Sequence, residues 1–147
     1  VLRGNHLLVS WSHSDNNRGS VSVFHKNPTT GLFETTPEAI LKPTDLSVDD
    51  LFGAVIDIDS TSNPVKPICA ISATGSRSVY LFERETHNGV AEWNQIQKLN
   101  AGVGQSDDGF GSSVKIYNNN VSIFVNPVGG CRSINITSEL SKTSLYS

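Results

Sequence analysis

The chain has 147 residues, enough for one domain with a modest hydrophobic core. It has 37% hydrophobic and 17% charged residues and a formal net charge of -3, with its 11 Lys and Arg scattered along the sequence. This balance is typical of a soluble globular protein and gives no reason to expect a nucleic-acid partner. No apolar run approaches the roughly 20 residues that cross a bilayer, so no membrane span is expected in this segment.

Short runs of β-branched and aromatic residues, separated by segments rich in Gly, Asn, Asp, Ser and Pro, predict strands along the whole chain. No segment carries a convincing helical stripe, so the predicted fold class is all-β. In chain order the predicted strands are 6–11, 20–26, 33–42, 52–59, 68–73, 78–85, 93–99, 110–117, 121–125 and 132–137, with a remnant at 143–146.

The sequence repeats itself. "VDDLFGAVIDI" (48–58) matches "SDDGFGSSVKI" (106–116), and the offset is 110 − 52 = 58 residues. The repeat extends over the windows 20–58 and 78–116. In these windows the residue 58 positions later is of the same type for Ser20, Val21, Phe24, Gly31, Glu34, Leu41, Asp49, Asp50, Phe52, Gly53 and Ile58.

About four strands in each repeat unit are typical of a β-propeller, in which each blade is a four-stranded antiparallel sheet. We therefore expect about two and a half blades: a partial blade over 1–47, a complete blade over 48–101 and a partial blade over 102–147. A β-sandwich is the alternative all-β architecture, but a sandwich does not require a gapless repeat.

The Phe-Gly pairs are expected to be structural. Each Phe ring fills the space between neighbouring sheets, and the Gly after it lets another backbone pass close by. The preceding aspartates accept backbone N–H bonds and hold the turn into the strand. The residues concerned are Asp49, Asp50, Phe52, Gly53, Asp107, Asp108, Phe110 and Gly111. Trp11 and Trp93 are expected to pack between blades, with sugar stacking as the alternative.

The stretch "EWNQIQKLNAGVGQSDDGFGSSVKI" (92–116), preceded by "SVYLFER", resembles the FG-GAP repeat of integrin α-subunit propellers. It is more similar still to FG-GAP proteins of microbial and protist cell surfaces, and the resemblance covers roughly residues 6–137. It implies a propeller at the cell surface or outside the cell. It also implies a calcium loop, for which the candidates are Asp57, Asp59, Thr61 and Asn63, although the family's glycine and closing carboxylate are missing here.

Other motifs give few sites. Cys69 and Cys131 allow one disulfide, and a buried free thiol at Cys69 is the alternative. Asn120 ("NVS") and Asn135 ("NIT") are N-glycosylation acceptors if the protein is secreted. The four histidines share no metal-ligand spacing, and neither a serine-nucleophile elbow nor a phosphate loop is present. No catalytic residue and no cofactor other than calcium is expected.

Two to three blades do not close a propeller, and exposed blade faces need neighbours. The chain begins without Met, so we expect a processed piece that is unstable or oligomeric alone, with further blades or subunits as partners. The leading hypothesis is a non-enzymatic extracellular or cell-surface protein of adhesion or structural type. It would present loops such as 12–19, 60–66, 86–92 and 102–108 to protein or glycan ligands. The alternatives are a lectin-like propeller that binds glycans between blades, and an accessory propeller of a hydrolase.

Overall fold

The computed structural model describes residues 1–64, 66–101, 109–118, 120–124 and 131–135, with Phe124 and the last strand described by their backbone alone. Every sheet in this part of the chain is antiparallel, which confirms the predicted all-β class. The strands are β1 (Leu2–Arg3), β2 (His6–Ser10), β3 (Val21–His25), β4 (Ala39–Leu41), β5 (Phe52–Asp59), β6 (Ile68–Ala73), β7 (Ser78–His87), β8 (Val90–Asn100), β9 (Val114–Tyr117), β10 (Asn120–Phe124) and β11 (Cys131–Asn135).

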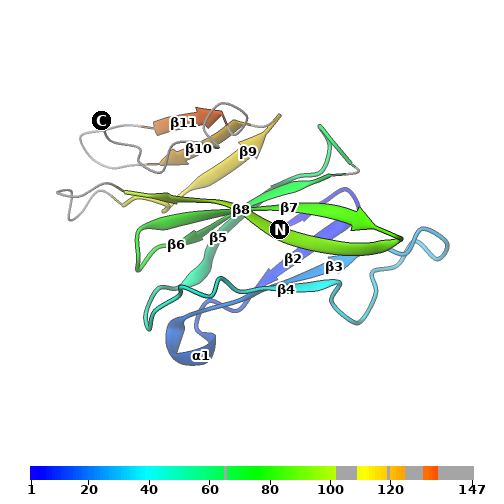
Figure 1. The fold of residues 1–147 in the computed structure, drawn as a ribbon, viewed down its shortest axis with the longest axis horizontal. Coiled ribbons are helices and arrows are strands. Elements are labelled where there is room, and N and C mark those ends of the chain that lie inside the picture. Colours follow the sequence, from blue (N-terminus) through cyan, green and yellow to red (C-terminus); the bar gives the residue numbers. More distant parts are fainter. Residues whose placement is uncertain (65, 102–108, 119, 125–130, 136–147) are drawn as a thin grey trace.

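These strands form three sheets in which sequence neighbours pair. The first sheet has the order β1-β2-β3-β4, the second β5-β6-β7-β8, and the third β9-β10-β11. The second sheet lies between the other two (Figure 1). A single helical turn, α1 (Ser14–Asn17), lies in the connection from β2 to β3, and its residues Asp15, Asn16 and Asn17 have positive φ.

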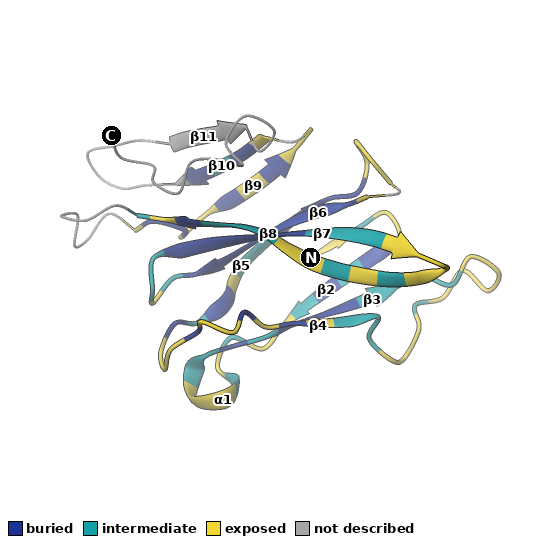
Figure 2. Cartoon of the chain, in the orientation of Figure 1, coloured by how far each residue is buried: buried dark blue, intermediate teal, exposed yellow. Residues whose placement is uncertain are grey.

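Strand β6 and the first half of β7, in the second sheet, are buried on both faces, as Figure 2 shows by their dark blue colour, whereas most of β8 is half-buried or exposed. One cluster lies between the first and second sheets and includes Leu8, Val21, Ile71 and Tyr80. The other lies between the second and third sheets and includes Ala70, Leu81, Val114 and Ile123. Alternate residues of a strand point to opposite faces, so adjacent residues such as Ala70 and Ile71 serve different clusters.

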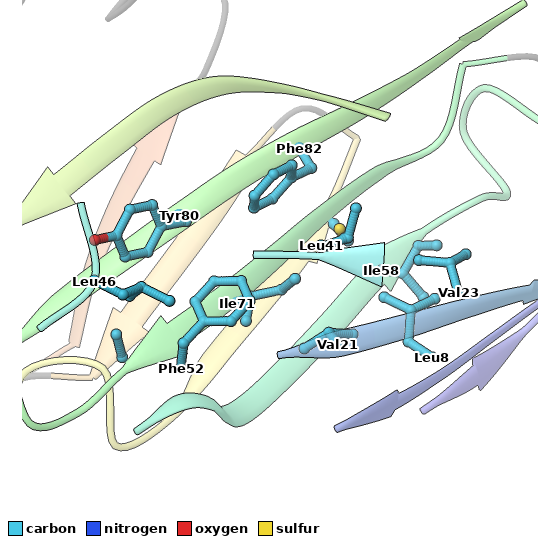
Figure 3. Packing of buried hydrophobic residues seen from close by; sticks show 12 residues of the cluster. Leu8, Val21, Val23, Leu41, Leu46, Phe52, Ile58, Ile71, Tyr80 and Phe82 are labelled. Carbon is cyan, nitrogen blue, oxygen red and sulfur yellow. The ribbon is translucent and has the colours of Figure 1, made fainter. Parts of the chain in front are cut away.

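Phe52 and Phe110 have matching positions in these two clusters. The Phe52 ring is fully buried and meets the Tyr80 ring edge-on, with 5.5 Å between centroids (Figure 3). Phe110 is 2% exposed in the cluster between the second and third sheets. Each ring therefore fills the space between one sheet and the sheet before it.

The glycines after these rings have matching surroundings as well. A Cβ on Gly53 would lie 3.1 Å from Val21 Cγ2, and one on Gly111 would lie 3.4 Å from Val79 Cγ2. The two valines are separated by 79 − 21 = 58 residues, the offset of the sequence repeat. Both glycines have positive φ, +93° and +82°. The backbone repeats together with the sequence, because the same close approach recurs between successive sheets.

The imperfect alternation of "WNQIQKL" has a structural reason. The register between β7 and β8 shifts between Leu81↔Gln97 and Phe82↔Gln95, which leaves Ile96 as an extra residue in β8. Beyond such a bulge, each residue of the strand points to the opposite side of the sheet from the one that strict alternation would give. As a result Trp93 packs toward the first sheet, whereas Leu99 packs toward the third.

Several details differ from the sequence prediction. The predicted strand 110–117 is reduced to β9, because Phe110 and Gly111 lie in the turn before it. The expected strand over 33–42 is reduced to β4, because residues 33–38 have no partner strand apart from a single bridge between Lys26 and Phe33. The short strand β1 was not predicted. Trp11 is 58% exposed at the end of β2, so it packs between no two of the sheets described here.

Among the residues that the structure describes, no helical segment has the length and apolar character to cross a membrane.

Candidate functional site

A polar cluster lies between the first and second sheets, beside the apolar core. Strand register assembles it from pairs: His6 of β2 lies opposite His25 of β3, and Arg84 of β7 lies opposite Trp93 of β8. The fifth member, Glu38, stands just before β4. Two pairs of cross-strand neighbours thus face one another across the gap between the sheets.

Glu38 is the centre of this cluster. Arg84 donates to both carboxylate oxygens, from Nε to Oε1 at 2.8 Å and from Nη2 to Oε2 at 2.9 Å. Trp93 Nε1 donates to Oε1 at 2.9 Å. Burial opposes ionisation of the carboxyl, but the hydrogen bonds from Arg84 and Trp93 outweigh it and hold the pKa of Glu38 below its usual value. Glu38 and Arg84 therefore form a charged, hydrogen-bonded pair that links the first and second sheets.

His6 is the least satisfied member of the cluster. Its side chain is 3% exposed, and neither ring nitrogen has a hydrogen-bond partner. The ring lies edge-on to Trp93, with 5.9 Å between centroids, and 5.0 Å from the His25 ring. Burial, together with the positive charges of His25 and Arg84, lowers the pKa of His6 to about 4. The imidazole is therefore neutral near pH 7.

A small open cavity of about 140 Å³ adjoins His6. It is lined by the Gly4–Asn5 turn, His6, His25, Ser60, Pro64 and Arg84. Neutral imidazole offers one N–H donor and one acceptor nitrogen, and Arg84 offers only donors. With a pKa near 4, His6 is too weak a base for proton transfer at neutral pH, so the arrangement is suited to binding.

Sequence reasoning missed this cluster because its members are distant in the chain. The four histidines were compared by spacing alone, and 19 residues separate His6 from His25 (25 − 6 = 19). The predicted strands 6–11 and 20–26 contain His6 and His25, and they are consecutive in the chain. Pairing them as neighbours would have placed the two histidines near each other.

Two aspartates of β5, both among the calcium candidates, form a second polar site against the third sheet. Asp57 is 1% exposed, and its Oδ2 accepts a hydrogen bond from the Ile116 N–H at 3.0 Å. Asp59 Oδ2 accepts from the Asn118 N–H at 2.6 Å. Both bonds join β5 to the β9 region, so these carboxylates connect the second and third sheets.

Asp59, Thr61 and Asn63 lie together at the end of β5 and in the loop after it, and the carboxylate of Asp59 and the amide oxygen of Asn63 accept hydrogen bonds from the chain itself. Asp59 Oδ1 accepts from the Thr61 N–H, the Thr61 hydroxyl and the Ser62 N–H, all at 3.0 Å. Asn63 Oδ1 accepts from the Lys66 N–H at 3.1 Å. Burial opposes ionisation of Asp59, but hydrogen bonds from Ser62, Asn118 and Thr61 hold its pKa well below its usual range.

Within the described ranges, no three His, Cys, Asp or Glu side chains lie close enough together to hold a metal ion. Calcium at Asp57, Asp59, Thr61 and Asn63 stays a prediction.

The aspartates before Phe52 play different parts. Asp50 is buried, and its Oδ2 accepts from the Ser47 N–H at 2.8 Å across the turn into β5. Asp49 instead accepts a hydrogen bond from the Asn17 side chain at 2.8 Å, which ties the β2–β3 connection to this turn. The equivalent aspartates, Asp107 and Asp108, lie outside the described residues.

The remaining candidate residues lie apart from both polar sites. Cys69 is a free thiol in β6, and burial raises its pKa far above the usual value. The side chain of Cys131 is outside the described residues. Asn120 is exposed in β10, and its register partner in β11 is Asn135, so both glycosylation acceptors occupy paired strands.

A scan against protein-family models and a search of the curated proteins find no match for this chain.

Proposed function

We propose that the three sheets are successive blades of an FG-GAP-type β-propeller, and that the protein is a non-enzymatic scaffold of structural or adhesion type at the cell surface. The proposal is supported by the matched surroundings of Gly53 and Gly111, which repeat the same contact between successive sheets. Sheets that stack through one recurring contact form a rigid body whose loops hold fixed positions.

The observation that carries the proposal is the outer face of the first sheet, which points away from the second sheet. The strand register pairs Leu7 with Phe24, Val9 with Ser22, and Ser22 with Ile40. These residues lie on the outer face. Ile40 is 63% exposed, and Leu2, the partner of Leu7, is 59% exposed. Contiguous apolar residues on one sheet face are typical of an interaction surface.

The corresponding face of the second sheet indicates what covers such a surface. That face carries Cys69, Ile71 and Tyr80, and the first sheet buries it completely. By the repeat, the occupant of the outer face of the first sheet is a further four-stranded sheet of the same kind. In a solution of this chain alone, only a second copy supplies such a sheet.

Sedimentation velocity tests the proposal. We expect the chain to self-associate with increasing concentration, because dimerisation would bury the outer face of the first sheet. Ile40→Lys places a charge on that face and should shift the protein to monomer. Val90→Lys is the matched control, since Val90 is 62% exposed at the β7–β8 hairpin of the second sheet and lies on neither outer face of the stack.

Two results would contradict the proposal. One is a monomer at every concentration together with a cooperative thermal transition, which would mean that the outer face needs no partner. The other is an equal loss of association in Ile40→Lys and Val90→Lys, which would mean that association does not use the outer face of the first sheet.

A further inference from the structure

We propose that the cavity beside His6 is a binding site for a small oxyanion, such as a carboxylate or sulfate group. This site is separate from the outer face of the first sheet, and its occupation does not depend on how the sheets assemble. The argument uses the size of the cavity, the donors on its wall and the charges around it.

The cavity has room for such a group. At about 30 Å³ for each water molecule, its volume of about 140 Å³ corresponds to four or five waters. A carboxylate or sulfate group fits in that space, whereas a long peptide or an oligosaccharide does not. The cavity is open on one side, so an anion could be free in solution or carried by a larger molecule at its mouth.

The wall has donors in excess of acceptors. Arg84 has five N–H donors. Three of its hydrogen bonds go to Glu38 Oε1, Glu38 Oε2 and Thr86 Oγ1, which leaves two donors (5 − 3 = 2). His6 adds an N–H with no partner. The buried N–H of His6 lacks an acceptor, the remaining N–H groups of Arg84 lie on a partly exposed side chain, and an oxyanion supplies two or more acceptors for them.

The surrounding charges favour an anion over a cation. Arg84 and His25 line the cavity with His6, and Arg3, the register partner of His6 in β1, forms an ion pair with Asp57 at 3.7 Å. The carboxylate nearest to His6, Glu38, does not line the cavity, and both of its oxygens already accept hydrogen bonds from Arg84 and Trp93. No carboxylate is among the lining residues, so a metal cation would meet positive groups without a compensating negative charge.

Occupation should be linked to protonation of His6. An anion in contact with an imidazole stabilises its charged form and raises its pKa by about 1 to 3 units. With a free pKa near 4 and a rise of about two units, the affinity for the anion should increase about tenfold between pH 7 and pH 5. The His6→Gln variant separates this contribution from that of His25, which also faces the cavity.

The experiment uses the 147-residue chain and follows histidine ring resonances by NMR during titration with sodium acetate, sodium sulfate or sodium chloride at matched ionic strength. Acetate and sulfate should shift the His6 resonances saturably and raise the pKa of His6 by at least one unit, whereas chloride should not. Acetate alone would identify a carboxylate site, and sulfate alone a site for tetrahedral oxyanions. His6→Gln should remove the tenfold dependence on pH.

Two further variants keep the test independent of folding defects. Asn5→Trp fills the mouth of the cavity from an exposed position and should abolish the response without touching His6. His87→Gln changes a histidine that is exposed and away from the cavity, and should leave the response intact. The proposal is overturned if His6 does not respond to acetate or sulfate, responds equally to chloride, or responds unchanged in Asn5→Trp.

Discussion

Replacing Gly53 by Ala tests the contact that joins successive sheets. Gly53 has a φ of +93°, and an added Cβ would lie 3.0 Å from Ser10 Cβ and 3.1 Å from Val21 Cγ2. Gly111→Ala makes the same change one repeat later, at φ +82°, where the nearest atoms are 3.2 Å and 3.4 Å away. Neither neighbour is the mobile end of a long side chain, so the atoms at the contact must shift by a few tenths of an ångström.

The structure sets the expected magnitudes. Positive φ costs a non-glycine residue about 1 kcal/mol. An overpacked contact of this kind adds about 1 to 3 kcal/mol. We therefore expect Gly53→Ala to lower the free energy of unfolding by about 3 kcal/mol, and Gly111→Ala, whose contacts are longer, by about 2 kcal/mol.

Gly31 and Gly89 are matched controls, because they are also related by the repeat (89 − 31 = 58) and have φ of +70° and +80°. An added Cβ at either position meets nothing within 4 Å, so each Ala variant should lose only about 1 kcal/mol. Urea denaturation of the four variants measures the differences. Equal losses in Gly53→Ala and Gly89→Ala would refute the reasoning, because the close approach would then contribute nothing.

The remaining predictions concern the polar sites. Between pH 6.5 and about 4, the unfolded chain protonates His6 and the folded chain does not, so stability falls as pH falls through this window. The pKa difference corresponds to a loss of roughly 3 kcal/mol. Urea denaturation at each pH should show this loss, and His6→Gln should remove it. Asp57→Ala leaves the Ile116 N–H without its acceptor and should cost about 2 kcal/mol by thermal denaturation, whereas Lys42→Ala, at an exposed surface pair with Asp15, should leave stability unchanged. Millimolar calcium should leave the melting temperature unchanged, because the oxygens of Asp59 already accept N–H bonds; a rise that Asp59→Asn abolishes would instead establish the calcium site.

The sequence predicted best where local pattern and tertiary structure agree. The predicted strands 52–59 and 68–73 have the observed bounds, because 52–59 has an apolar residue at every second position and 68–73 is an apolar run covered on both faces. The repeat also identified the Phe-Gly positions, since Phe52 and Phe110 pack between sheets in the same way.

Prediction failed where the outcome depends on contacts between distant segments. Residues 33–38 have strand-like composition, but they have no partner strand and remain irregular. The reversal of faces in β8 arises from a bulge at Ile96, which no local pattern specifies. The cluster around Glu38 joins residues 46 and 55 positions apart, and only the stacking of two sheets brings Arg84 and Trp93 to it.

The most direct test of the central claim, that successive sheets stack through one repeated glycine contact, is the pattern of nuclear Overhauser effects at the two glycines. We predict effects from the Gly53 Hα protons to the Val21 methyl groups, and from the Gly111 Hα protons to the Val79 methyl groups, with no cross-peaks between the two sets. Effects at only one of the two glycines, or long-range effects from Gly111 to residues outside the second sheet in place of those to Val79, would contradict the account.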